Sequence, residues 1–134
     1  MSLLLVNDGE QLLLQEIVGA FMTMHLYTND VVRDKTITLA QLTECTAQGY
    51  MTTDLDPVNW RFARDPVSGL MMAVYGPVIF SFLEAVSAYG YYITTKEADG
   101  TDRLMCLDQL VGGGAFNLPS TGGNISVTAR LSLL

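Results

Sequence analysis

The last segment of the chain constrains its fold more than any other feature. Over residues 124–133 apolar side chains alternate with polar ones: Ile125, Val127, Ala129, Leu131 and Leu133 on one side, and Asn124, Ser126, Thr128, Arg130 and Ser132 on the other. Because successive side chains of a β-strand point to opposite faces, this spacing predicts one long strand with a solvated face. Its apolar face must be covered by a second layer of structure.

Short β patterns separated by turn signals fill most of the remaining chain. Met22, Met24 and Leu26 occupy alternate positions, and further strands are predicted over residues 50–55, 59–63, 70–75, 78–83, 89–95 and 103–107. Asp99-Gly100 is a hairpin signal, and Gly76-Pro77 indicates a bulge within one long edge strand or a break between two strands. These seven or eight strands predict an all-β fold, an antiparallel β-sandwich or jelly-roll-like domain spanning residues 1–134.

The first part of the domain, about residues 1–19, is expected to combine an arm with a short helix. Asn7 or Asp8 is predicted to cap a helix whose third position is Gln11, a near-match to the capping box. An apolar stripe at helical spacing follows, consisting of Leu12, Leu13, Ile17 and Val18. Gly19 is expected to end this helix, and a second short helix is predicted after Thr38.

Composition favours a protein whose surface is partly covered by a partner. Of the 134 residues, 49% are hydrophobic and 16% are charged, against about 25% charged residues in average domains. The net charge of -7 argues against nucleic acid, because phosphate binding depends on clustered Lys and Arg, and against an anionic membrane surface. We find no signal peptide and no apolar run of about 18 residues, so no membrane partner is expected.

The residue types that carry chemistry are too scattered to indicate an active site. His25 is the only histidine, and no nucleophile motif accompanies it, so we expect a structural or surface role. Cys45 and Cys106 stand alone and are interpreted as reduced core thiols. Asp54 and Asp56 are interpreted as turn caps, and the acidic residues of the 97–102 hairpin as a solvated turn. We therefore expect no enzymatic activity, no cofactor and no metal.

Three segments are candidates for contact with a partner. The apolar arm is suited to lie on another surface or to add to a neighbour's sheet. An aromatic strand and a Gly-rich loop over residues 112–123 are the other two, since long loops commonly bind partners. The candidate residues are Leu3, Leu4, Leu5 and Val6 in the arm, Tyr89, Tyr91 and Tyr92 in the strand, and Gly113, Phe116 and Leu118 in the loop.

Several ordered pieces resemble the small virion structural proteins of tailed bacteriophages. They are LLLVNDGE over residues 3–10, MHLYTND over residues 24–30, TLAQLTE over residues 38–44, Tyr50 after Gly49, GYYI over residues 90–93, and the closing alternation over residues 124–133. The resemblance covers most of the chain but rests on order and pattern, without a catalytic signature.

The resemblance implies a non-enzymatic β-sandwich that binds the major capsid protein shell as a cement or decoration protein. It also implies a homo-oligomer, with a trimer favoured, located in the virion after synthesis in the host cytoplasm. Two alternatives stay open: a tail or neck adaptor or fibre component, and a small glycan- or ligand-binding β-sandwich in which Trp60, Tyr91 and Tyr92 would stack on the ligand. Deletion of residues 1–6 is expected to weaken assembly while leaving a folded domain.

Overall fold

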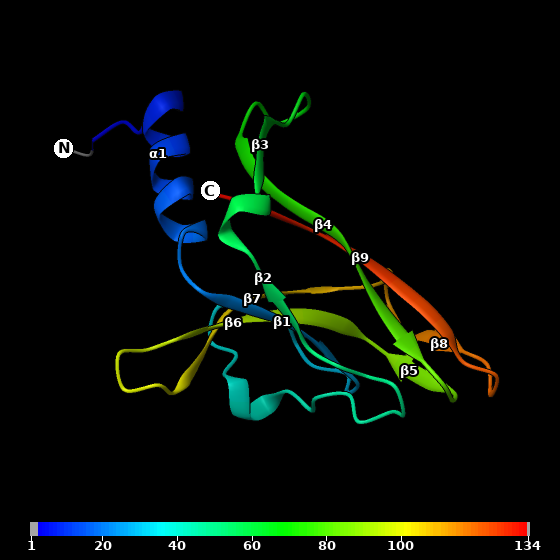
Figure 1. Ribbon diagram of the computed structural model, residues 1–134. Coiled ribbons are helices and arrows are strands. Elements are labelled where there is room, and N and C mark those ends of the chain that lie inside the picture. Colours follow the sequence, from blue (N-terminus) through cyan, green and yellow to red (C-terminus); the bar gives the residue numbers. More distant parts are fainter. Residues whose placement is uncertain (1–2, 134) are drawn as a thin grey trace.

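A computed structural model describes residues 3–133, which form one helix near the N-terminus and nine strands (Figure 1). The helix is α1 (Asn7–Val18), and two short 3-10 helices are η1 (Leu39–Gln41) and η2 (Pro57–Asn59). The strands are β1 (Met22–Tyr27), β2 (Thr53–Leu55), β3 (Arg61–Arg64), β4 (Met71–Phe82), β5 (Val86–Ala88), β6 (Gly90–Lys96), β7 (Asp102–Gln109), β8 (Phe116–Leu118) and β9 (Gly123–Ser132). The fold is therefore all-β with a short N-terminal helix, as the sequence predicts.

The strands form three antiparallel sheets. A four-stranded sheet has the order β2-β1-β6-β7, a three-stranded sheet has the order β3-β4-β9, and β5 pairs with β8 at one end of the molecule. Met24 and Leu26 of the first sheet and Phe80 and Val127 of the second belong to the same buried cluster. The two larger sheets thus cover each other's apolar faces, and α1 packs against β4 at the edge of this core.

The clearest sequence patterns are confirmed. In β9, Ile125, Val127 and Ala129 are buried, whereas Ser126 and Arg130 on the opposite face are exposed. The hairpin predicted at Asp99-Gly100 joins β6 to β7, and in β1 the three residues predicted on one face, Met22, Met24 and Leu26, are all buried. These patterns were readable because one face of each strand is buried and the other is not.

The start of α1 differs from the prediction. The helix includes Asn7 and Asp8 in its first turn, and the residue that precedes it, Val6, makes no side-chain capping bond. Asp8 and Glu10 lie in that turn, where negative charge interacts favourably with the helix dipole. The predicted end at Gly19 is confirmed, and the predicted second helix is the single turn η1 after Thr38.

Three predicted segments need correction. Only residues 53–55 of the predicted strand 50–55 pair with β1, because Tyr50 turns into the core and stacks against Phe80 and Phe82. The predicted strand 59–63 begins only at Arg61, after η2. The predicted long loop 112–123 contains β8, which pairs with the unpredicted β5, because half-buried Phe116 and Leu118 pack against the core.

Strand β4 is one continuous strand with a register shift between Tyr75 and Val78, at Gly76-Pro77. Of the two predicted interpretations, the bulge within a long strand is confirmed. The strand is not at an edge, however, since it lies between β3 and β9. Proline is tolerated in this central position because the bulge removes one residue from the regular ladder.

Candidate interaction surface

A group of exposed apolar side chains lies at the N-terminal end of the molecule, where the exposed Asp8 lies beside Leu12. Leu3 and Leu4 are 98% and 87% exposed, and nothing within residues 3–133 covers them. We call this the N-terminal apolar surface, and it consists of Leu3, Leu4, Leu5, Val6, Leu12 and Leu13. Exposed apolar side chains that gather in one region of a protein mark a candidate interaction site.

Helix α1 explains why this surface is exposed. Leu14 and Val18 are buried on the side that packs against β4, and Glu10 Oε2 accepts a hydrogen bond of 3.2 Å from the backbone N–H of Met71. Leu12 and Leu13 therefore face away from the core and are 62% and 47% exposed. Of the apolar stripe predicted from the sequence, Ile17 and Val18 pack into the core. The other two members stay exposed, because a single helix cannot bury both of its sides on one strand.

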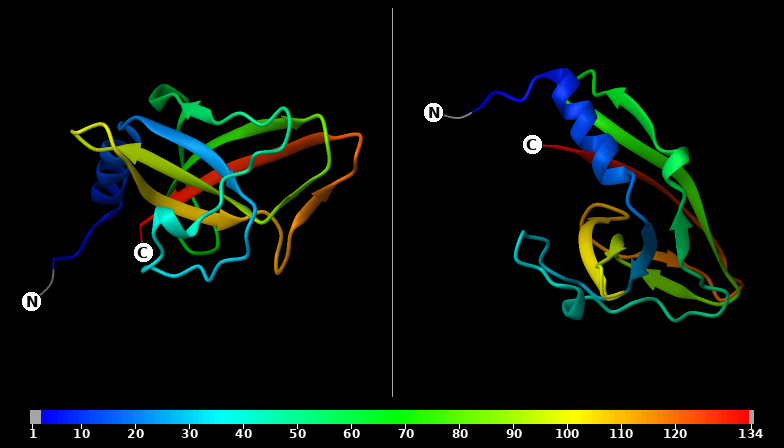
Figure 2. Two further views of the ribbon diagram at one scale, coloured as in Figure 1. Left: turned by 90° about the horizontal axis from the view of Figure 1, so that it is seen from below. Right: turned by 60° about the vertical axis from the view of Figure 1, so that its left-hand side comes forward.

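The arm continues the same surface at the first turn of the helix. A Cβ atom built on Gly9 would come within 2.9 Å of Leu5 Cδ1, so Leu5 lies directly against this glycine. Residues 9 and 13 are one helical turn apart, which places Leu13 next along the same side. The arm leads away from the body of the molecule (Figure 2).

The second candidate segment, the Gly-rich loop, offers less apolar surface than its sequence suggested. Gly113 lies at the tip of a turn closed by a bridge between Val111 and Gly114, and its φ of 82° is one that glycine adopts readily. Phe116 and Leu118 are half-buried and pack against the core from β8. Of the three predicted contact residues in this loop, only Gly113 is exposed.

The third candidate segment, the aromatic strand, lies largely inside the molecule. Tyr91 and Tyr92 are 9% and 4% exposed, and Tyr89 is half-buried. Burial raises the pKa of Tyr91 to about 12 and raises the pKa of Tyr92 above its usual value. These side chains lie in the core or pack on the outer face of the four-stranded sheet. A single copy therefore does not present them to a partner.

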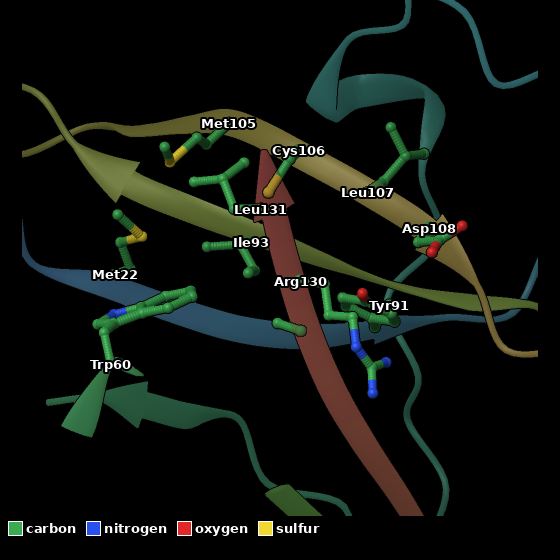
Figure 3. A pocket seen from close by; sticks show the side chains of 11 residues that line it. Met22, Trp60, Tyr91, Ile93, Met105, Cys106, Leu107, Asp108, Arg130 and Leu131 are labelled. Atoms are coloured by element: carbon green, nitrogen blue, oxygen red, sulfur yellow. The ribbon is translucent and has the colours of Figure 1, made fainter. Parts of the chain in front are cut away.

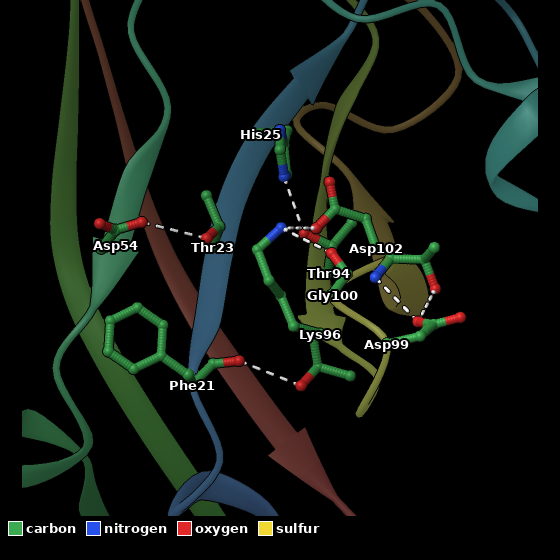
Figure 4. Close-up of polar contacts among 11 residues, drawn as sticks. Phe21, Thr23, His25, Asp54, Thr94, Lys96, Asp99, Gly100 and Asp102 are labelled. Carbon is green, nitrogen blue, oxygen red and sulfur yellow. Dashed lines mark hydrogen bonds and ion pairs between the residues drawn. The ribbon is translucent and has the colours of Figure 1, made fainter.

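His25 lies at the centre of a polar network on that outer face. Its Nδ1 shares a hydrogen bond with Glu44 Oε2, and its Nε2 shares one of 2.9 Å with Thr94 Oγ1 (Figure 4). The imidazole ring stacks on Tyr92 with ring centres 4.5 Å apart. Glu44 also accepts a hydrogen bond of 2.9 Å from the Tyr50 hydroxyl, which itself accepts one from the backbone N–H of Leu26.

The order carboxylate, imidazole, hydroxyl in this network is that of a hydrolytic triad. Thr94 is only 3% exposed, however, so its hydroxyl is not open to a substrate. The network instead joins the long segment between β1 and β2 to the sheet, through Glu44 and Tyr50. These contacts supply a structural role for His25.

Most of the acidic residues that stood out in the sequence serve turns and ion pairs, but the turn cap predicted at Asp54 is wrong, because this residue lies within β2, opposite Thr23. Asp56 accepts a hydrogen bond from the backbone N–H of Val58 and so begins η2, while Asp54 accepts one from Thr23 (Figure 4). Hydrogen bonds from Thr101 lower the pKa of Asp99, and Lys96 lowers the pKa of Asp102. Within residues 3–133, no group of three His, Cys, Asp or Glu side chains is placed to hold a metal ion.

The two cysteines are free thiols in different surroundings. Cys45 is buried in the core, as the sequence predicts, and Cys106 is half-buried on β7. Burial raises the pKa of the Cys106 thiol to about 11. Neither thiol is therefore placed as an activated nucleophile, since activation requires a lowered pKa.

The part of the chain that the structure describes has no helix both long enough and apolar enough to cross a bilayer. Comparisons with protein-family models, with curated proteins and with solved structures found no match to this chain.

Proposed function

We propose that this chain is a non-enzymatic structural protein of a tailed-phage virion, a capsid cement or decoration protein that binds the major capsid protein. The resemblance of its ordered sequence pieces to small virion proteins supports this proposal. In this role the chain acts in the virion as a homo-oligomer, with a trimer favoured.

One observation carries the proposal, namely the exposed leucines of the N-terminal apolar surface on an ordered helix. Leu12 and Leu13 project from α1, which Leu14 anchors to the core. Exposed leucines on a rigid helix suit contact with a second protein, because their burial releases water. Many copies that each bury a modest patch would together stabilise a shell through multivalency.

The aromatic side chains that suggested glycan binding are buried. Trp60 is 6% exposed, and Tyr91 and Tyr92 are also buried. Sugar stacking requires an exposed aromatic face, and none of these three rings presents one on a single copy. The tail or neck alternative uses the same surface and differs only in its location in the particle.

Co-sedimentation with empty capsids tests the proposal. Capsids of the phage that carries this coding sequence are stripped of the chain and mixed with the purified protein. We expect the unaltered protein to pellet at a fixed ratio to the major capsid protein. The double variant Leu12→Asp/Leu13→Asp should bind at least 10-fold more weakly, because two carboxylates would have to be desolvated at the contact.

The double variant Val58→Asp/Val67→Asp provides the matched control, because it adds the same two charges at exposed valines in η2 and in the turn between β3 and β4. This control should pellet like the unaltered protein. Gold-labelled antibodies on intact virions distinguish shell from tail. Failure of the unaltered protein to pellet with capsids, together with label on the tail, would replace the cement function with the tail or neck alternative.

A further inference from the structure

We propose that the arm of one copy, residues 3–6, docks into a cavity between β7 and β9 of a second copy. The inference goes beyond the proposed function, because it concerns contact between identical chains and holds whatever surface the assembly binds. It assigns separate roles to the two parts of the N-terminal apolar surface. The arm joins copies, and Leu12 and Leu13 remain free for another partner.

The recipient is a cavity of about 90 Å³ between the two larger sheets (Figure 3). Its buried walls are apolar and come from Met22, Trp60, Ile93 and Ala129. At the other end lie exposed Asp108 and Arg130, which place its mouth at the surface. An apolar cavity of about 150 Å³ binds benzene, so a cavity of about 90 Å³ can take one smaller apolar group, such as a leucine side chain.

The strands on both sides of this cavity are edge strands. Within residues 3–133, β7 pairs only with β6 and β9 pairs only with β4. Their outer edges therefore present backbone N–H and C=O groups without strand partners, which an extended segment can use by β-strand addition. A peptide that lies along this opening can place a side chain in the cavity and its backbone against an edge.

The indole N–H of Trp60 favours a peptide over a purely aliphatic ligand, because a peptide carries hydrogen-bond acceptors. The indole Nε1 is buried and has no hydrogen-bond partner in the described part of the chain. An unpaired buried donor is costly, and a backbone carbonyl would satisfy it where a hydrocarbon would not. In Figure 3 this nitrogen lies at the end of the ring nearest the Trp60 backbone, so a carbonyl can reach it only from that side of the cavity.

The arm has the chemistry that this cavity needs. It has neither helical nor strand structure over residues 3–6, and Val6 has an extended backbone. Leu3 and Leu4 are the most exposed leucines of the described chain, and residues 3–6 carry no charged side chain. Copies with a net charge of -7 repel one another, so an uncharged arm is the segment best suited to join them.

The arm of the same copy is held away from the cavity. It leaves from the N-terminal end of α1, whereas Met22 in the cavity wall follows the other end of that helix. Twelve helical residues span about 18 Å, and the arm continues outward from there (Figure 2). The occupant of the cavity therefore comes from a second copy.

Charge complementarity agrees with this arrangement. Asp8 follows the arm directly and is exposed, and Arg130 lies at the mouth of the cavity. Neither side chain forms an ion pair within residues 3–133. An arm seated in the cavity brings the Asp8 carboxylate of one copy toward the Arg130 guanidinium of the other.

A complementation experiment with full-length chains tests the proposal. The donor variant Leu3→Asp/Leu4→Asp disables the arm but keeps the cavity. The acceptor variant Ala129→Leu fills the cavity but keeps the arm. We expect each variant alone to associate at least 10-fold more weakly than the unaltered protein in sedimentation velocity. An equimolar mixture should form a 1:1 complex, because each variant supplies what the other lacks.

The fluorescence of Trp60 reports the site directly, since it is the only tryptophan of the chain. Its emission should shift when the two variants are mixed and should stay constant when either variant is concentrated alone. A charge exchange provides a second acceptor test that leaves the core untouched. Arg130→Glu should weaken association, and Asp8→Lys in the same chain should restore it.

The double variant Leu12→Asp/Leu13→Asp provides the matched control, because it adds the same two negative charges to the helix instead of the arm, and it should associate like the unaltered protein. The proposal is overturned if the unaltered protein is monomeric at 100-fold the concentration used for the variants. It is also overturned if the two variants fail to complement each other while the charge exchange has no effect. Loss of capsid binding with intact self-association would contradict the proposed function alone.

Discussion

At the scale of single residues, the structure depends on one glycine at the start of β6. Gly90 lies opposite Tyr27 in the ladder between β1 and β6, and a Cβ atom at this position would overlap the Asp108 carbonyl oxygen and the Tyr27 ring. The Tyr27 hydroxyl donates to that same carbonyl over 3.3 Å. Glycine is required here because Tyr27 and the β7 backbone leave no room for a side chain. Backbone conformation is not the reason, because the φ of Gly90 is not positive.

We predict that Gly90→Ala lowers the free energy of unfolding by about 3 kcal/mol, because the added methyl group forces the backbone of β7 or the ring of Tyr27 to move. Urea denaturation measures the change. Gly112→Ala is the matched control, since nothing lies within 4 Å of a Cβ atom there and its φ is not positive. An equal effect of the two substitutions would show that the close approach at Gly90 is not required for stability.

The elements differ in how their apolar side chains are used, and α1 shows this most clearly. Leu12, Leu13 and Leu14 are consecutive in the sequence, yet Leu14 is fully buried and the other two are exposed. Because a helix turns about 100° per residue, three adjacent leucines cannot share one buried face. One of them anchors the helix to the core, and the other two contribute to the N-terminal apolar surface.

We predict that Leu14→Ala lowers the free energy of unfolding by about 3 kcal/mol, since it leaves a cavity between α1 and β4. Leu12→Ala should change it by no more than about 0.5 kcal/mol, because the side chain is already in contact with water. Thermal or chemical denaturation of the two variants at low protein concentration compares them without self-association. Equal losses would contradict the assignment of Leu12 to the surface.

At the scale of the whole molecule, the core and the arm are separable. The connected core includes α1 and both larger sheets, whereas none of the side chains of residues 3–6 belongs to it. A backbone hydrogen bond from the Glu10 N–H to the Val6 carbonyl oxygen connects the end of the arm to the helix. Stability and assembly are therefore expected to respond to different parts of the chain.

We predict that deletion of residues 1–6 leaves the circular dichroism spectrum and the midpoint of thermal unfolding of the monomer nearly unchanged, within about 3 °C. The same deletion should abolish self-association in light scattering, because it removes the docking segment. Met1 and Ser2 lie outside the described residues, and the prediction rests on residues 3–6. Unfolding of the shortened chain would show instead that the arm is part of the folding unit.

The sequence by itself determined the all-β class, the N-terminal helix and the long final strand. In β9 and β1 the period of two is produced by burial of one face, which is a local property that the order of residues records. The hairpin at Asp99-Gly100 was readable for a similar reason, because turn chemistry depends on a few adjacent residues.

Only the tertiary structure decided which apolar residues are covered. Tyr91 was predicted to contact a partner and is buried, whereas Leu12 was predicted only as part of an apolar helical stripe and is exposed. The pairing of β5 with β8 and the cavity beside Trp60 depend on segments about 30 to 100 residues apart in the chain. Such contacts are set by how the sheets pack against each other, and no local period in the sequence encodes them.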